Sequence, residues 1–528
     1  MFFADTFGGS PVFDDKFSGD HSGRKKTSCG VWLSQILPDS RFIACDDIIA
    51  MGCHDDPARC GPGDVFVARL TAHGDGHEEV ARAIARGVSG IVAERMVPTF
   101  GTPLCLIADS GSALTRISHA LAGNPATAMR VIAITGTSGK TTTAWLTAAV
   151  LSEAGLRVGI LSDLGCLAAD STEPLAADLA QPLVLAAWLG QLAASGCTHA
   201  VVEVSSRMLA ERALAGIACD TVVVTNLSTA HLDLHSTKKS YHTIKSSILE
   251  SLGENGCLIA GVDDKHVQRL CQRNGADRPG CAMITAGLSV TADLSASPIE
   301  RSLYGQTFLL RASGGMVPIA VTTPVASFVR NAMLAAAIGL RYRVPLERIA
   351  RGIEAAGSVA GRMERLDRGQ EFSVFLDQPT SNHALRSTLC SLRKLTQGRL
   401  ILIADEQQTV ALSGDAQRQR SNLSADKQFA FRASRWCDEC LVVSSGMLED
   451  DADAQDVADY ARIDRLLSSL NQYDCLLVLG KSLSAAGGPT DPLDGILPLA
   501  AVIDGWLQLA HPPQCAFPQR SSERRRAA

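Results

Sequence analysis

The fold of this chain is decided by Val131-Ile-Ala-Ile-Thr-Gly136-Thr-Ser-Gly-Lys140-Thr141-Thr-Thr143. An apolar run typical of a buried strand leads into a glycine-rich turn, and the apolar spacing after Lys140 and Thr141 is that of a helix. A strand, a glycine turn and a helix in this order predict a phosphate-binding loop, whose backbone N–H groups close around phosphate oxygens. The lysine would reach the outer phosphates, and the threonine hydroxyl would ligate Mg²⁺. An ordinary strand-to-helix turn is the alternative, and the Lys-Thr pair favours nucleotide binding over it.

The bulk composition restricts the class of protein. The 528 residues are 46% hydrophobic and carry a formal net charge of −6, which suits about three or four domains and argues against general nucleic-acid binding. Aromatic residues make up 5% of the chain, so a base-stacking platform is not expected. The N-terminus lacks the pattern of a signal peptide, and no apolar stretch is long enough to span a bilayer. We expect a cytoplasmic protein without membrane insertion.

The cysteines indicate the same compartment. Sixteen are scattered along the chain, and only Cys437 and Cys440 form a Cys-x-x-Cys pair. No second pair lies at zinc-binding spacing, and most of the others sit in apolar runs where cysteine acts as a small core residue. A reducing compartment is the simplest interpretation.

Composition and the turn-forming glycine and proline residues predict three α/β domains between two tails. Residues 1–28 are polar and glycine-rich and are expected to be disordered, and the basic tail 516–528 is expected to be a solvated end. A small α/β domain is expected over 29–126 and a larger one, which opens with the phosphate loop, over 127–357. A third domain is expected over 358–515, where strand and helix patterns alternate as in a doubly wound sheet.

Short apolar and β-branched runs predict the strands of these domains, because such runs suit buried parallel strands. The predicted strands are 65–68 and 90–93 in the first domain, 199–204, 220–225 and 257–260 in the second, and 372–376, 399–403, 439–443 and 475–479 in the third. Helices are predicted at 78–86 and 325–340.

Three later features narrow the chemistry around the phosphate loop. Glu203 ends a predicted strand, and the carboxyl end of a strand is where α/β sheets bind ligands. His231 and Asp233 follow another strand end, and Lys245 lies on a predicted helix shortly after. Each has an ordinary explanation when taken alone, such as a loop histidine or a solvated lysine. Their order behind one phosphate loop favours a shared site with Mg²⁺.

These pieces, together with others along the chain, resemble the Mur ligase family, most closely its UDP-N-acetylmuramoyl-tripeptide synthetase (MurE) branch. The similar segments occur in family order and span most of the chain: Pro62-Gly-Asp-Val-Phe-Val-Ala68, Asp75-Gly-His77, Gly123-Asn-Pro125, Thr135 to Thr142, Glu203-Val-Ser-Ser206, Thr225 to Asp233, Tyr241 to Lys245, Asp263-Asp264, Asn331 and Gly361-Arg-Met-Glu-Arg365.

The resemblance implies an α/β fold with three domains. They are a small N-terminal UDP-binding domain, a central P-loop ATPase with a mainly parallel sheet, and a C-terminal Rossmann-like domain that receives the amino acid. It also implies a reaction: ATP phosphorylates a carboxylate of a UDP-linked muramoyl peptide, and the amine of a free amino acid attacks the acyl phosphate. Positioning and charge neutralisation dominate such phosphoryl transfer. A monomer is expected.

The resemblance also implies residue roles. Lys140, His231 and Lys245 would be catalytic, with Lys245 matching a carbamylated lysine. Thr141, Glu203, His231 and Lys245 would serve Mg²⁺. The remaining expected contacts are nucleotide-binding at Gly136, Thr137, Ser138, Gly139, Lys140, Thr141, Thr142, Asn331 and Arg362, and substrate-binding at Asp56, Arg59, Ser205 and Arg212.

The departures from the family pattern lie at the substrate ends. Asp377-Gln-Pro-Thr380 stands where the family has Asp-Tyr-Ala-His, and Val443 to Glu449 lacks the arginine of the diaminopimelate-adding enzymes. Losing an arginine fork that recognises a carboxylate weakens diaminopimelate as the added amino acid. A ligase with a changed acceptor pocket is the main interpretation. A Mur-like ligase acting on another carboxylate and a catalytically weak nucleotide-binding homologue are the alternatives.

Overall fold

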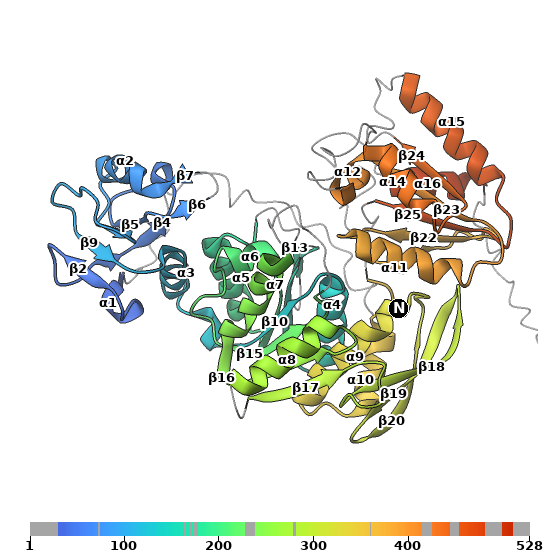
Figure 1. Ribbon diagram of the computed structural model, residues 1–528, viewed down its shortest axis with the longest axis horizontal. Helices are drawn as coiled ribbons and strands as arrows, with labels where there is room; N and C mark the ends of the chain where they lie inside the picture. Colours follow the sequence, from blue (N-terminus) through green and yellow to red (C-terminus); the bar gives the residue numbers. More distant parts are fainter. Residues whose placement is uncertain are drawn as a thin grey trace, which may run out of the picture. The chain divides into compact units, whose positions relative to one another are not determined.

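The computed structural model describes residues 30–71, 74–162, 164–168, 171–173, 178–227, 238–277, 281–359, 361–413, 425–443, 454–480 and 499–510. Its contacts divide the chain into two compact units. The first contains 1–301, 305–322 and 326–357, and the second contains 302–304, 323–325 and 358–528. Figure 1 shows the helices and strands along the chain.

The N-terminal part of the first unit is a small sheet with helices. Its five strands run in the order β2-β9-β8-β5-β4, with β2 antiparallel and the others parallel. Two short two-stranded ladders, β1-β3 and β6-β7, accompany it. The elements are β1 (Val31–Trp32), α1 (Leu33–Ile36), β2 (Arg41–Ile43), β3 (Ile49–Ala50), β4 (Gly52–His54), η1 (Pro57–Arg59), β5 (Asp64–Val67), β6 (Leu70–Thr71), β7 (Gly74–Asp75), η2 (Gly76–Glu79), α2 (Val80–Ala85), β8 (Gly90–Ala93), β9 (Leu104–Leu106) and α3 (Ser110–Leu121).

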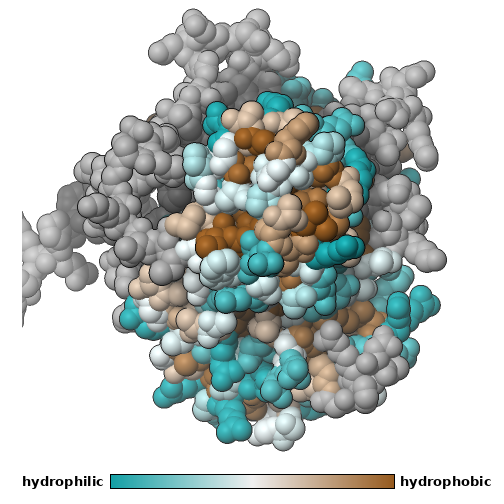
Figure 2. Space-filling model, turned by 90° about the vertical axis from the view of Figure 1, so that its left-hand side faces the viewer, coloured by the Kyte–Doolittle hydropathy of each residue, from teal (hydrophilic) through white to brown (hydrophobic). Residues whose placement is uncertain are grey.

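This part also exposes apolar side chains. Figure 2 shows brown apolar residues among teal polar ones on the face that it presents. Trp32, Ile49 and Met51 are each more than two-fifths exposed, and Trp32 pairs with Ile49 across the β1-β3 ladder.

An eight-stranded sheet forms the centre of the first unit, in the order β13-β12-β11-β14-β10-β15-β16-β17. Its neighbouring strands pair in parallel, except that β12 is antiparallel to both β11 and β13. Its elements, with the helix before β10, are η3 (Pro125–Thr127), β10 (Arg130–Thr135), α4 (Lys140–Glu153), β11 (Val158–Ser162), β12 (Gly165–Ala168), β13 (Ser171–Glu173), α5 (Pro182–Ala194), β14 (His199–Glu203), α6 (Ser206–Ala210), β15 (Cys219–Val224), α7 (Lys238–Ser246), η4 (Ser247–Ser251), β16 (Leu252–Gly261), α8 (Lys265–Asp277) and β17 (Ala282–Ala286).

Helices cover both faces of this sheet, so its strands are apolar on both sides. Ile132 and Ile134 of β10 belong to a core with α4, α9 (Ala326–Arg341) and α10 (Leu346–Ala355). The alternate residues Val131 and Ala133 belong to a second core with α5, α6 and α8. A strand that alternates between two buried faces reads as a continuous apolar run, which is why β10 stands out in the sequence.

A three-stranded sheet, β18 (Ser295–Ser302), β19 (Gly305–Ala312) and β20 (Gly315–Val321), precedes α9. The sequence patterns did not predict it. Buried and half-exposed residues alternate along β19, as expected for a strand with one face toward a core.

The second unit contains a five-stranded sheet in the order β21-β22-β25-β23-β24, parallel except for β21. Alternate residues of its strands belong to two cores. Its elements are β21 (Glu364–Leu366), β22 (Ser373–Asp377), α11 (Asn382–Arg393), β23 (Leu400–Asp405), α12 (Glu406–Ser413), α14 (Ala425–Ala433), β24 (Glu439–Val443), α15 (Ala454–Ser468), β25 (Cys475–Leu479) and α16 (Leu499–Ala510).

The α/β class and all nine predicted strands are confirmed to within a residue or two at their ends, except that 257–260 is part of the longer β16. The helix predicted at 78–86 is α2 preceded by the 3₁₀ turn η2, and the one at 325–340 is α9. In the described part of the chain, no helix is long and apolar enough to cross a membrane.

Candidate active site

The glycine-rich turn lies at the carboxyl end of the central strand. β10 ends at Thr135 between β14 and β15, and α4 begins at Lys140. Gly139 has a φ of +82°, in the left-handed region that favours glycine. A Cβ atom at Gly139 would lie 2.3 Å from Oδ1 of Asn331, and one at Gly136 would lie 1.9 Å from Oγ1 of Thr225. Both positions need glycine because neighbouring side chains fill the space.

Two residues that follow β15 hold the turn. The Asn226 side-chain amide donates to the Ser138 carbonyl at 2.9 Å, and its Oδ1 accepts from the Ser138 N–H at 3.1 Å. The Thr225 hydroxyl donates to the same carbonyl at 2.7 Å, and the Asn226 carbonyl accepts from the Thr137 N–H at 3.1 Å. These bonds fix the shape of the turn, and N–H groups fixed at the start of a helix suit an anion.

Lys140 and Glu203 meet beside the turn. Nζ of Lys140 lies 3.6 Å from Oε1 of Glu203, the last residue of β14, and Glu203 is only 2% exposed. The sheet register brings them together, since Glu203 pairs with Ile134 of β10. Thr141 is buried in the first turn of α4. This edge therefore offers a cation, a carboxylate and a hydroxyl next to the N–H groups of the turn.

Lys245 reaches the same turn from α7. Its Nζ donates to the Gly136 carbonyl at 2.9 Å and to Oγ1 of Thr135 at 3.4 Å, and the residue is 3% exposed. The ammonium lies 5.5 Å from the ring centroid of Tyr241, one helical turn earlier. The Tyr241 hydroxyl lies 3.1 Å from Oγ1 of Thr137, and burial raises the pKa of this phenol. α7 thus contacts the turn through a lysine and a tyrosine.

α9 contributes the other predicted nucleotide residue of the first unit. Asn331 is buried and lies against Gly139, as its contact with a Cβ there shows. The preceding residue, Arg330, pairs with Asp263 at 2.8 Å. Asp264 accepts from the Leu227 N–H at 3.0 Å, directly after the Thr225-Asn226 pair. The segments around β15, β16 and α9 therefore meet at the turn.

The expected magnesium ligands are only partly described. Thr141 and Glu203 supply the hydroxyl and carboxylate oxygens that Mg²⁺ prefers. His231 and Asp233 lie outside the described residues. Within the described ranges, no group of three or more His, Cys, Asp or Glu side chains is arranged to hold a metal ion. The donor set fits a cation held by one or two protein oxygens and by phosphate oxygens, which is how Mg²⁺ usually binds beside a nucleotide.

The residues expected to bind substrate do not gather at the turn. Asp56 caps η1 by accepting from the Ala58 N–H at 2.8 Å, and Arg59 ends the same short helix. Ser205 caps α6 by accepting from the Met208 N–H at 3.1 Å. Arg212 pairs with Glu250 at 2.9 Å and lies 3.6 Å from Asp109. These contacts give each residue a structural role, and a substrate role stays a prediction.

Arg362 belongs to the second unit, where its guanidinium donates to the carbonyl of Gln378. Asp377, at the end of β22, is buried and accepts from the Met363 N–H at 3.4 Å and from the Thr388 hydroxyl at 3.2 Å. Burial raises the pKa of the Asp377 carboxyl, and the charge of Arg362 opposes that shift. The Asp377 carboxylate, which the chain shares with the family motif, is thus hydrogen-bonded to residues of its own unit. Residues 444–449, where the family arginine is missing, lie outside the described residues.

The sequence analysis missed three residues of the site. Thr225, Asn226 and Tyr241 were noted as parts of motifs without a role, and the structure places all three in contact with the phosphate loop. The available signal was their position, because Thr225 and Asn226 directly follow a predicted parallel strand and Tyr241 lies one helical turn before Lys245.

Comparison with protein families connects this geometry to one group of enzymes. The model of the Mur ligase middle domain matches residues 134–339. A UDP-N-acetylmuramoyl-L-alanyl-D-glutamate–2,6-diaminopimelate ligase of Chlorobium phaeobacteroides is 31% identical over 352 residues, which cover 65% of this chain and 69% of the relative. A UDP-N-acetylmuramyl-tripeptide synthetase of a Roseiflexus species is 28% identical over 411 residues, or 74% of this chain and 77% of the relative.

Solved structures share the fold. A UDP-N-acetylmuramoyl-L-alanyl-D-glutamate–2,6-diaminopimelate ligase superposes with a TM-score of 0.67 at 19% identity, covering 91% of this chain and 99% of that one. The MurF ligase of Thermotoga maritima in complex with ADP gives 0.55 at 15% identity, covering 87% of this chain and 98% of the other.

Proposed function

The chain belongs to the Mur ligase family, and from this premise we propose that it is an ATP-dependent amide ligase of peptidoglycan precursor synthesis. It joins an amino acid to a UDP-N-acetylmuramoyl-peptide. The observation that carries the proposal is the phosphate loop with Lys140, Glu203 and Lys245 around it. A nucleotide site alone would suit many enzymes, but Lys245 behind the loop suits the metal-assisted ligase reaction.

The residues of the turn bind and orient ATP. The N–H groups at the start of α4 would bind the phosphates, and Lys140 neutralises charge on the phosphoryl group that moves to the substrate carboxylate. Asn331, which lies beside Gly139, would contact the nucleotide, and a nucleotide role for Arg362 stays a prediction. Mg²⁺ would be held by Thr141 and Glu203, with His231 and a carbamylated Lys245 serving a second ion, and it would neutralise phosphate charge. The amine of the amino acid then attacks the acyl phosphate, which releases phosphate and leaves the new amide.

The wider architecture follows the family pattern. We assign residues 29–126 to UDP binding, with Asp56 and Arg59, and assign Ser205 and Arg212 to the muramoyl peptide. Residues 127–357 would form the ATPase domain and residues 358–515 the domain that receives the amino acid. The protein would act as a cytoplasmic monomer. The chain departs most from the family at the amino-acid end, so the added amino acid is expected to differ from diaminopimelate.

The test is an acceptor screen. The protein is incubated with UDP-N-acetylmuramoyl-dipeptide, ATP, Mg²⁺ and each amino acid in turn, and products are read by mass spectrometry and released phosphate. One amino acid should give a new amide and stoichiometric ADP. Absence of both products with every amino acid would overturn the proposal and favour the nucleotide-binding homologue. ADP formed with a different carboxylate substrate would favour the Mur-like alternative.

The control variant for this screen is Lys140→Met. It keeps the apolar stem of the side chain but removes the cation, so turnover should fall by at least about a hundredfold. Lys265→Met makes the same change at an exposed residue at the start of α8 and should keep full turnover. Equal activity of the two variants would remove the phosphate loop from the mechanism.

A further inference from the structure

One arginine links the N-terminal part of the first unit to the central part that contains the eight-stranded sheet. Arg69 donates from Nη1 to Oδ2 of Asp55 at 2.8 Å and from Nη2 to Oε2 of Glu211. Asp55 lies 14 positions from Arg69 in the sequence, whereas Glu211 lies 142 positions away, directly after α6. The Arg69 guanidinium therefore holds one residue of each part at the same time.

Arg69 and Asp55 lie at one end of the N-terminal sheet. Asp55 directly follows β4, and Arg69 is the second residue after β5, which is parallel to β4. His54 pairs with Phe66 in this ladder, so the two charged residues leave neighbouring strands at their carboxyl ends. Open α/β sheets bind their ligands outside the carboxyl ends of the strands. The link therefore starts at the edge of the N-terminal sheet that suits a ligand.

The side chain of Arg69 is more enclosed than those of its two partners. It is 11% exposed, against 39% for Asp55 and 36% for Glu211. A Cβ at Gly111, in the first turn of α3, would lie 3.8 Å from Nε of Arg69, so the guanidinium lies beside the start of that helix. A planar guanidinium donates in fixed directions to two carboxylates, whereas a lysine ammonium is a point charge on a flexible stem. This link therefore favours arginine over lysine.

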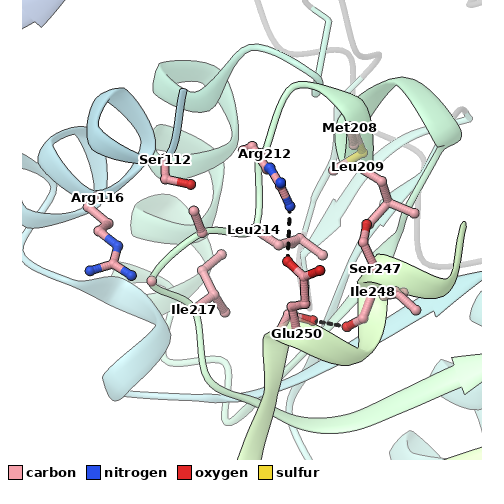
Figure 3. A pocket seen from close by; sticks show the side chains of 13 residues that line it. Ser112, Arg116, Met208, Leu209, Arg212, Leu214, Ile217, Ser247, Ile248 and Glu250 are labelled. Atoms are coloured by element: carbon pink, nitrogen blue, oxygen red, sulfur yellow. Dashed lines mark hydrogen bonds and ion pairs between the residues drawn. The ribbon is translucent and has the colours of Figure 1, made fainter. Parts of the chain in front are cut away.

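The residue that follows Glu211 has different surroundings. Arg212 pairs with Glu250 at 2.9 Å and lies 3.6 Å from Asp109, and all three side chains are more than two-fifths exposed. Figure 3 shows the ion pair between Arg212 and Glu250, which joins the segment after α6 to η4. Exposed ion pairs contribute little to stability, so a substrate anion can displace them. Glu211 is thus held by an enclosed arginine, while Arg212 is accessible to a ligand.

We propose that Arg69 is a positioning residue of the ligase, which fixes the distance between the part that binds UDP and the part that binds the muramoyl peptide. This inference rests on the proposed function, in which Asp56 contacts UDP and Arg212 contacts the peptide. Asp55 and Glu211, the two partners of Arg69, directly precede these residues in the sequence. A substrate that contacts both parts gains affinity over its UDP end alone only when the two parts stay at the matching distance.

The experiment compares the affinity for UDP-N-acetylmuramoyl-dipeptide with that for UDP, by calorimetry on the full chain with Mg²⁺ and a non-hydrolysable ATP analogue. The parent chain should bind the dipeptide substrate more tightly than UDP. Arg69→Met, which keeps the apolar stem, should reduce this affinity ratio about tenfold and leave the affinities for UDP and for the ATP analogue within about twofold. Both partner carboxylates are partly exposed, so the change leaves no buried charge without a partner and the chain should fold.

Two further variants and a control sharpen the test. Glu211→Gln removes the charge of one partner at nearly constant size and should lower the affinity ratio about threefold. Arg69→Lys keeps the charge but loses the planar fork, so its ratio should lie between those of the parent chain and Arg69→Met. Arg351→Met removes an ion pair with Glu153 that joins α10 to α4 within the central part, and it should leave the ratio unchanged.

Failure of this inference and failure of the proposed function give different results. If the parent chain prefers the dipeptide substrate and Arg69→Met keeps that preference, the inference is overturned and the proposed function stands. The inference is also overturned if Arg69→Met weakens UDP binding by the same factor, or if the parent chain binds UDP and the dipeptide substrate equally. If the parent chain binds neither, the proposed function is overturned and the inference with it.

Discussion

The two large sheets each carry a buried carboxylate at the carboxyl end of a parallel strand, but the two groups have different surroundings. Glu203, the last residue of β14, faces the ammonium of Lys140 beside a turn that Thr225 and Asn226 hold by hydrogen bonds. Asp377, the last residue of β22, accepts hydrogen bonds from Met363 and Thr388 of its own unit. The same topological position thus carries the proposed ligand site in one sheet and internal hydrogen bonds in the other. Topology selects where a site can form, and the neighbouring donors decide whether one does.

The largest difference is expected between the isosteric amide substitutions of these two carboxylates. Glu203→Gln should lower turnover by at least about a hundredfold, because a neutral amide neither balances Lys140 nor holds a divalent cation. Asp377→Asn should keep activity within about twofold, since the amide oxygen still accepts from Met363. Turnover and ADP affinity are measured on both. A hundredfold loss of turnover in Asp377→Asn would contradict this difference and show that the second sheet also takes part in catalysis.

The next largest effect concerns the turn itself. Gly139 and Gly155 have nearly the same φ, +82° and +83°, but a Cβ at Gly155 meets nothing within 4 Å. Alanine at either position costs about 1 kcal/mol for the left-handed backbone. At Gly139 it also collides with Asn331, so Gly139→Ala should lose at least tenfold in ADP affinity while Gly155→Ala should not. Calorimetric titration with ADP, alongside urea unfolding, separates the two costs. Equal affinities would show that the turn tolerates a side chain.

Lowering the pH should change the contributions of His119 and Asp377 to folding stability in opposite directions, with one of these residues in each unit. Burial lowers the pKa of His119, on α3 in the first unit, to about 4. The unfolded chain binds the proton near pH 6.5, so the contribution of this residue to stability is lost as the pH falls below that value, by about 3 kcal/mol at pH 4. Asp377 has a raised pKa, so its contribution is present at low pH and is lost as the pH rises through its folded pKa.

The acid response is measured by hydrogen exchange of peptides from α3 and β22 between pH 7 and pH 4. His119→Leu provides the matched comparison, because its stability should not show this loss. An equal pH dependence of parent and variant would show that His119 titrates normally.

The smallest effect is expected at Tyr241. Tyr241→Phe removes the hydroxyl that contacts Thr137 and keeps the ring beneath the Lys245 ammonium. The loss of one hydrogen bond is worth about 1 kcal/mol, which corresponds to about fivefold weaker ADP binding. Tyr241→Leu, which also removes the ring, should weaken binding further. Identical affinities in all three proteins would limit Tyr241 to packing.

A strand or site residue could be predicted where a local sequence pattern encodes it, but not where it depends on contacts between residues far apart in the sequence. β10, β14 and β15 are buried on both faces, so continuous apolar runs and a glycine boundary reveal them. β18 to β20 were missed because half-exposed strands have weaker patterns. Lys140 and Glu203 could be paired from the rule for strand ends, but the bonds of Asn226 depend on β15 lying next to β10. Arg212 meets Glu250 and Asp109, and no local pattern encodes which charges surround an exposed arginine.

The order of the strands has a consequence for biosynthesis. β10 lies between β14 and β15, so the phosphate loop is completed by residues made much later, with 88 positions separating Ser138 from Asn226. A ribosome adding roughly 5–20 residues per second needs on the order of ten seconds to make that stretch. During this interval the nascent chain carries the nucleotide motif without the groups that hold it in shape. We expect ATP to bind only after β15 has left the exit tunnel, so nucleotide capture would mark a late step in the folding of this unit.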